Sequence, residues 1–265
     1  MKDRVSTANT TLAAQTQSYS PTFFADSAPT SLRSARLMLG HLFDFYRPRS
    51  VIDVGCGPGA WLAAAEELGA TSLEGIDGPW VQPSTLLSKR IHFRPTDLAS
   101  DFVTTGGRDL CISVEVAEHI APEAAGRFVK SLCTLSDVVV FSAAIRLQGG
   151  VMHVNEQPQS YWARHFAEHD YECFDFFRPL FWSEHLIDPW YRQNVLLYIR
   201  KLHPLATALR ARGPVVGPLD TVHPEIYEGN LNRYKRAVDE PTLRFCLLSF
   251  GRWFRRKVLS TNVSR

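Results

Sequence analysis

The segment 51–61 constrains the fold of this chain more than any other part, and it reads VIDVGCGPGAW. An apolar run of strand type enters a loop with Gly55, Gly57 and Gly59 at alternate positions, and a helix-forming stretch from Ala60 to Leu68 leaves it. Glycine tolerates positive φ and has no side chain to keep a ligand away from the backbone. A helix N-terminus also offers free N–H groups. The pattern predicts a strand, loop and helix that bind a nucleotide-like ligand.

Acidic residues accompany this loop on two strands. Asp53 lies within the first apolar run, two residues before Gly55, and the second expected strand, 73–76, leads directly into Asp77 and Gly78. A carboxylate at the end of the second strand of such a unit accepts hydrogen bonds from ribose hydroxyls. The alternative interpretation is a generic turn in which Asp77 only caps the next segment. We favour the ligand site because two ligand-facing features occur in the order that it requires.

Composition limits the class of protein. The chain has 265 residues, of which 45% are hydrophobic, enough for one large α/β domain with or without an appendage. A formal net charge of +2 argues against nucleic acid as the main partner. Five scattered cysteines without a C-x-x-C pair indicate reduced thiols. We therefore expect a cytoplasmic protein without an export signal or a membrane-spanning helix.

Between residues 31 and 200 the hydrophobic pattern alternates between strand and helix periods. A first helix is expected at 31–45, with Ser31 as its N-cap. Alternation of this kind predicts a doubly wound, mostly parallel sheet with helices on both faces. The expected strands are 51–54, 73–76, 91–93, 110–114, 138–141, 171–177 and 195–199, and the expected helices are 59–68, 122–135 and 159–168.

The two ends of the chain differ from its centre. Residues 1–20 are rich in Ser, Thr, Ala and Gln and predict a disordered arm, followed by aromatic residues that either anchor it or form a lid. Residues 21–200 form the expected α/β domain, and 201–265 an irregular connector with a basic extension. The segment 241–265 has six basic residues and no acid. A basic amphipathic helix here either docks on the domain or contacts anionic lipid or a protein partner. Nothing in the sequence fixes an oligomeric state.

A group of acids and a histidine follows the expected strand 110–114. Glu115, Glu118 and His119 have the spacing i, i+3 and i+4, so on a helical turn they would share one face. Two carboxylates and an imidazole can hold Mg²⁺ or Mn²⁺. In the alternative interpretation Glu115 orients a cofactor amine, Glu118 caps a helix, and His119 is a base or a polar wall.

A polar loop follows the expected strand 138–141 and a Gly149-Gly150 hinge. It lies at the carboxyl edge of the sheet, where ligands of open α/β folds gather, so we expect it to recognise a polar acceptor. In the alternative interpretation, side-chain hydrogen bonds within the loop only stabilise its own conformation. The candidate acceptor-binding residues are Asn155, Glu156, Gln157, Tyr161 and Trp162, and His153 is a candidate base.

The D-x-G-x-G-x-G string resembles the first motif of class I S-adenosylmethionine (SAM) methyltransferases. That resemblance implies that the glycine loop surrounds the methionine portion of SAM, that Asp97 meets the adenine amine and that Leu98 flanks the ring. The E-x-x-E-H string resembles ubiquinone-biosynthesis O-methyltransferases. It also resembles ribose methyltransferases of small-RNA ends, in which a later histidine, here His153, is a further metal ligand.

The strings H-x-N-E-Q…Y-W and PWYRQN are similar to those of a group of bacterial class I methyltransferases, over roughly 23–200. The resemblance implies a seven-stranded Rossmann-like sheet with an antiparallel last strand and SAM as cofactor. We expect O-methylation of a small polar acceptor, such as a sugar, phenolic or polyketide hydroxyl, with His119 or His153 as base and with Glu115 and Glu118 supporting that base. The alternatives are metal-dependent RNA ribose methylation, N- or C-methylation, and a non-catalytic SAM-binding interaction module.

Overall fold

The computed structural model describes residues 21–102, 106–212, 218–239 and 243–260. The chain divides into two compact units, the first ending at His223 and the second beginning at Pro224. The arm expected at 1–20 lies outside the described residues.

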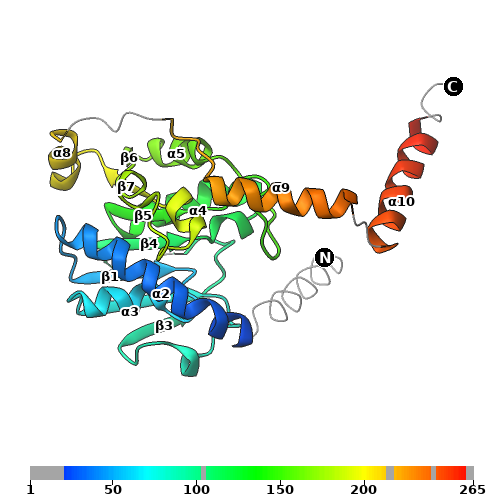
Figure 1. Ribbon diagram of the computed structural model, residues 1–265. Helices are drawn as coiled ribbons and strands as arrows, with labels where there is room; N and C mark the ends of the chain where they lie inside the picture. Colours follow the sequence, from blue (N-terminus) through cyan, green and yellow to red (C-terminus); the bar gives the residue numbers. More distant parts are fainter. Residues whose placement is uncertain (1–20, 103–105, 213–217, 240–242, 261–265) are drawn as a thin grey trace. The chain divides into compact units, whose positions relative to one another are not determined.

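The first unit is built on one sheet of seven strands in the order β3-β2-β1-β4-β5-β7-β6 (Figure 1). Only β7 runs antiparallel to its neighbours, β5 and β6, and the other pairings are parallel. This confirms the predicted Rossmann-like fold and its reversed last strand. The strands are β1 (Ser50–Val54), β2 (Ser72–Asp77), β3 (Ile91–Pro95), β4 (Leu110–Val114), β5 (Val138–Ser142), β6 (Tyr171–Phe174) and β7 (Leu196–Arg200).

Helices cover both faces of the sheet because successive strand side chains point to opposite sides. Val51 belongs to the hydrophobic core that contains α2 (Pro21–Phe43), α3 (Ala60–Glu67) and α8 (Pro204–Arg210). Its neighbour Ile52 belongs to the other core, formed with α4 (Ala125–Leu135) and α5 (Gln159–Ala167). Two short helices, α6 (Arg178–Phe181) and α7 (Pro189–Asn194), lie between β6 and β7 in the sequence.

The two largest differences from the predicted boundaries are at the start of α2 and at the end of β6. The first helix begins by Pro21, so Ser31 is not its N-cap but an interior residue whose hydroxyl bonds to Tyr191. The helix continues through Pro29, which gives up one backbone hydrogen bond but fits the helical φ. The strand expected to reach residue 177 ends at Phe174, because Asp175 instead forms an ion pair with Arg178 on α6.

The segment after β7 is more regular than the expected connector. Pro204 begins α8, where the missing proline N–H would have had no partner, and the His203 side chain accepts a hydrogen bond from the Leu205 N–H. Leu205 and Leu209 are buried in the first core. His223 is buried too, and its backbone N–H donates to Gln193 Oε1 over 2.8 Å. Residues of α8 and His223 therefore contribute to the first unit.

The second unit contains α9 (Pro224–Asp239) and α10 (Leu243–Ser260). The sequence pattern indicated the second of these helices but not the first. In α9 no described residue is buried. None of the described helices combines the length and the apolar character needed to cross a lipid bilayer.

Candidate functional site

The loop after β1 has the left-handed backbone that its glycines predict. Gly55, Gly57 and Gly59 have φ of 82°, 50° and 79°. A Cβ on Gly55 would lie 2.3 Å from Val116 Cγ2, and one on Gly59 would lie 2.5 Å from Ile91 Cδ1. Side chains are therefore excluded at both positions by conformation and by space. The loop leads directly into the N-terminus of α3, where N–H groups are free to meet a ligand.

Asp77, at the end of β2, is held by this loop. Its Oδ2 accepts a hydrogen bond from the Gly57 N–H over 2.8 Å, and its Oδ1 accepts one from the Gly78 N–H over 2.6 Å. The Trp80 side chain also hydrogen-bonds to this carboxylate, and its ring lies against Gly78, where a Cβ would come within 2.2 Å of it. Burial raises the pKa of Asp77 to about 6 in spite of these donors.

Asp53 places a second carboxylate beside the first. It lies on β1, next to β2 in the sheet, and is only 2% exposed. Burial and the charge of Asp77 raise the pKa of Asp53 well above its usual range. Two neighbouring buried carboxylates favour a ligand that brings hydroxyl donors or positive charge, because such a ligand relieves their desolvation and mutual repulsion.

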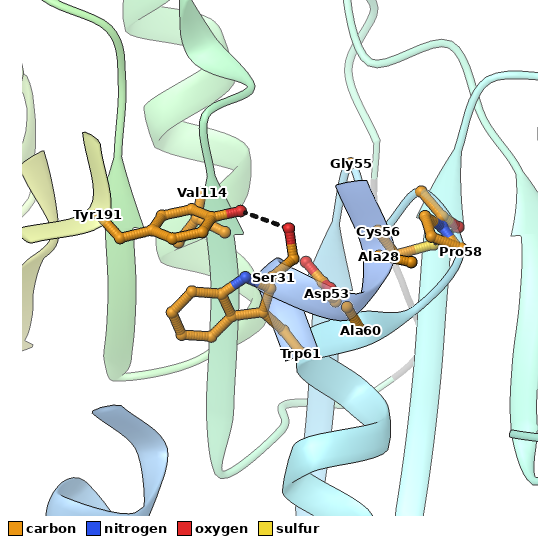
Figure 2. A pocket seen from close by; sticks show the side chains of 11 residues that line it. Ala28, Ser31, Asp53, Gly55, Cys56, Pro58, Ala60, Trp61, Val114 and Tyr191 are labelled. Atoms are coloured by element: carbon orange, nitrogen blue, oxygen red, sulfur yellow. Dashed lines mark hydrogen bonds between the residues drawn. The ribbon is translucent and has the colours of Figure 1, made fainter. Parts of the chain in front are cut away.

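A cavity of about 110 Å³ opens beside the glycine loop (Figure 2). Asp53 lines it together with Trp61 of α3 and Tyr191 of α7. Ser31 of α2 also lines it and lies 3.1 Å from the Tyr191 hydroxyl. A volume of this size holds only a few water molecules, so it fits the amino-acid end of a nucleoside ligand rather than the whole ligand. The side of the loop next to Asp77 is already occupied by Trp80.

Glu115 does not share a helical face with Glu118 and His119, contrary to the prediction. Its φ of 55° turns the chain sharply after β4, and only Ala117–His119 form a single 3₁₀ turn. The Glu115 carboxylate accepts hydrogen bonds from Gln148 Nε2 over 2.8 Å and from Asn194 Nδ2 over 3.1 Å. It thus faces two amides, and it lies outside the group of residues that could hold a metal.

Glu118, His119 and His153 do come together, as the sequence suggested. One ligand atom from each lies within 4.8 Å of the others. Glu118 is 1% exposed, and its Oε2 has no hydrogen-bond partner among the described residues. Burial and the charge of Glu115 raise the pKa of Glu118 well above its usual range. Burial lowers the pKa of His119 to about 4, so this imidazole is neutral at pH 7. A neutral imidazole and an unsatisfied buried carboxyl oxygen are suitable ligands for a cation.

His153 is oriented by the loop that carries it. Its Nδ1 lies 3.0 Å from Glu156 Oε1, and its Nε2 lies 3.9 Å from Glu118 Oε1. The Glu156 carboxylate also accepts from the backbone N–H groups of Leu147 and Gly149. The loop is tied to the 3₁₀ turn through the Glu118 carbonyl oxygen, which accepts from two backbone N–H groups at 2.9 Å. The contacts of Glu156 are those expected of a loop that stabilises itself by side-chain hydrogen bonds, and the His153 Nε2 is directed toward Glu118.

The remaining candidate residues occupy different environments. Asn155 is 2% exposed, accepts from Gln157 Nε2, and has an Nδ2 without a partner among the described residues. Trp162 is 1% exposed and packs against Phe141 in the core, while Tyr161 is half-buried at its edge.

Asp97 is exposed, and its carboxylate accepts from the Ala99 N–H and the Ser100 hydroxyl. It thus closes its own turn after β3, which is the ordinary structural use of an aspartate at that position. Leu98 packs against the second core.

Several site residues were not predicted. Ser31, Trp61 and Tyr191 line the cavity, and Gln148 and Asn194 hold Glu115. Tyr191 and Asn194 belong to the PWYRQN string, whose polar density just before the last strand was a signal. Ser31 and Trp61 gave no signal, because each falls on a helix that reads as ordinary core packing.

No protein-family model matches the chain, and no curated protein matches it in sequence. Among solved structures, the DhpI–SAH complex has a TM-score of 0.51 at 16% identity, covering 71% of this chain and 94% of that one. The magnesium protoporphyrin IX methyltransferase ChlM from Synechocystis PCC 6803 with bound SAH has a TM-score of 0.48 at 18% identity, covering 66% and 84%. The methyltransferase domain of bacterial CtHen1-C has a TM-score of 0.47 at 16% identity, covering 63% and 97%. At 16–18% identity a structural likeness shows the fold alone. Of these three structures, the fold assignment uses only the DhpI–SAH complex, whose TM-score is 0.51. This likeness and the strand order together show that the chain has the Rossmann-like methyltransferase fold.

Proposed function

We propose that this protein is a SAM-dependent methyltransferase that O-methylates a hydroxyl of a small polar acceptor. The observation that carries the proposal is the pair Asp53 and Asp77 at the glycine loop. The two carboxylates lie near the carboxyl ends of neighbouring strands, both are buried, and Asp77 is fixed by N–H groups of the loop itself. Such a site meets the ribose hydroxyls and the cationic end of a sulfonium nucleoside.

In this proposal the donor spans the loop. Its amino-acid end enters the cavity lined by Asp53, Gly57 and Tyr191. Its ribose binds Asp77, so the Trp80 side chain has to leave that carboxylate when the donor arrives. Asp97 and Leu98 are proposed beside the adenine, and Glu115, next to the cavity residue Val114, is proposed to orient the amino group.

Methyl transfer is an in-line displacement in which the acceptor oxygen forms a bond to the methyl carbon and the sulfur leaves as a neutral thioether. The hydroxyl must also lose a proton. His153 is the better base of the two candidates, because Glu156 accepts a hydrogen bond from Nδ1–H and leaves the Nε2 lone pair free for the hydroxyl proton. His119, with a pKa of about 4, binds a proton too weakly for this role at neutral pH. The polar side chains Asn155 and Gln157 and the ring of Tyr161 are proposed to position the acceptor.

A metal-assisted route is the second candidate, and the unsatisfied Glu118 Oε2 favours it. The ligands would be Glu118, His119 and His153. A bound divalent cation would acidify the acceptor hydroxyl by Lewis-acid contact. Two imidazole nitrogens favour a transition ion such as Mn²⁺ over Mg²⁺.

Glu118→Gln separates the two routes. Because burial already favours the neutral carboxyl, the neutral isostere should keep the melting temperature within about 2 °C. If the metal route operates, Mn²⁺ affinity measured by calorimetry should fall at least about tenfold, because a ligand must be deprotonated. The exposed Glu123→Gln serves as the matched control. Wild-type protein that takes up no Mn²⁺ at millimolar concentration, and whose activity survives EDTA, would exclude the metal route.

The proposed activity is tested by incubating the protein with SAM and panels of sugars, nucleotide sugars and phenols, with and without Mn²⁺, and measuring product mass. We expect a gain of one methyl group on a hydroxyl-bearing acceptor. A short RNA is included as a further substrate, and its methylation would support the ribose alternative instead. Binding of SAM without methylation of any acceptor would favour the non-catalytic module.

A further inference from the structure

Four apolar side chains of α10 form an exposed surface. Leu243, Leu247, Phe250 and Trp253 are 76%, 64%, 63% and 55% exposed. Their spacing of three and four residues places them on one side of the helix. The rings of Phe250 and Trp253 are stacked with centroids 5.8 Å apart. Contiguous exposed apolar surface of this kind marks an interaction site rather than ordinary surface.

The charge of this segment indicates which kind of partner the apolar surface of α10 binds. Residues 241–265 contain six basic residues and no acid, and Arg252 on α10 is exposed. The preceding helix provides a comparison within the same unit. It also exposes aromatic side chains, Tyr227 and Tyr234, but its three basic residues are balanced by three acids. Of the two helices described in this unit, α10 alone joins an apolar surface to uncompensated positive charge.

We propose that α10 docks in the plane of an anionic lipid surface. Leucine and aromatic side chains of an amphipathic helix enter the boundary between headgroups and acyl chains, and basic side chains contact the lipid phosphates. Tryptophan is suited to this boundary because its ring has an apolar body and a polar N–H. In this proposal the helix lies parallel to the lipid surface, with its apolar side toward the acyl chains. This inference is independent of the proposed methyl transfer.

Co-sedimentation of the full chain with vesicles tests the proposal. One set of vesicles is pure phosphatidylcholine, and the other contains about one quarter phosphatidylglycerol. We expect at least about tenfold stronger binding to the anionic vesicles, and a loss of that binding as salt is raised. The double variant Phe250→Ser/Trp253→Ser should lose it, whereas the matched variant Tyr227→Ser/Tyr234→Ser in α9 should keep it. The melting temperature should be the same in all three proteins, which shows that each is folded.

Other occupants of this surface give different results. Equal binding to both kinds of vesicle, or to neither, would overturn the proposal. So would full binding by the Phe250→Ser/Trp253→Ser variant. If light scattering shows a dimer that this variant dissociates, with no vesicle binding by the wild type, the apolar surface is an interface between two copies of the chain.

Discussion

Asp77→Ala is expected to weaken the binding of S-adenosylhomocysteine by about 10²- to 10⁴-fold. Hydrogen bonds to a charged acceptor contribute about 1.5–3 kcal/mol each, and a ribose presents two hydroxyls to this carboxylate. The variant also removes the acceptor of the Gly57 and Gly78 N–H groups, so the loop loses its fixed geometry. Titration calorimetry at pH 7.5, above the pKa of about 6, measures the wild-type affinity with Asp77 ionised.

Two further variants distinguish the loss of the contact between Asp77 and the ligand from unfolding of the protein. Asp77→Asn keeps one acceptor oxygen, so its affinity should lie between those of the wild type and the alanine variant. Asp101→Ala changes an exposed aspartate outside the site and should bind normally. A folded Asp77→Ala variant with wild-type affinity would mean that this carboxylate does not meet the donor.

His153→Ala is expected to lower kcat by about 10²- to 10⁴-fold on the acceptor found by product mass. Affinity for S-adenosylhomocysteine should change less than about threefold, because the proposed contacts of His153 are with the acceptor proton and not with the donor. Glu156→Gln keeps an acceptor for Nδ1–H but removes the negative charge that stabilises the protonated imidazole. Its kcat should therefore fall by a smaller factor, about tenfold.

The control for this series is His92→Ala. His92 is an exposed histidine on β3, so this variant should leave turnover unchanged. Near wild-type turnover by His153→Ala would show that the proton leaves by another path. A loss of donor affinity as large as the loss of kcat would instead assign His153 to the binding of SAM.

The sequence predicts the sheet well because the signals for a doubly wound sheet are local. Each buried strand is a short apolar run, and the loop at 55–59 must be glycine-rich because its backbone is left-handed. The end of β2 at Asp77 follows from the same pattern. The antiparallel β7 came from the family resemblance, since an apolar run does not specify its direction.

Other parts of the site depend on contacts between distant residues, which no local pattern records. Ser31 meets Tyr191 across 160 positions, and Glu115 meets Asn194 across 79. The assumption that Glu115 continued into a helix failed because its φ is positive, a conformation that a non-glycine residue adopts only where its surroundings impose it.

Calorimetric titration of the wild-type protein with S-adenosylhomocysteine and with SAM tests the central claim most directly. We predict that each binds at one molecule per chain, and that both raise the melting temperature, because a ligand that binds only the folded state stabilises it. Absence of binding heat and of thermal stabilisation at millimolar concentrations of both compounds would contradict the account.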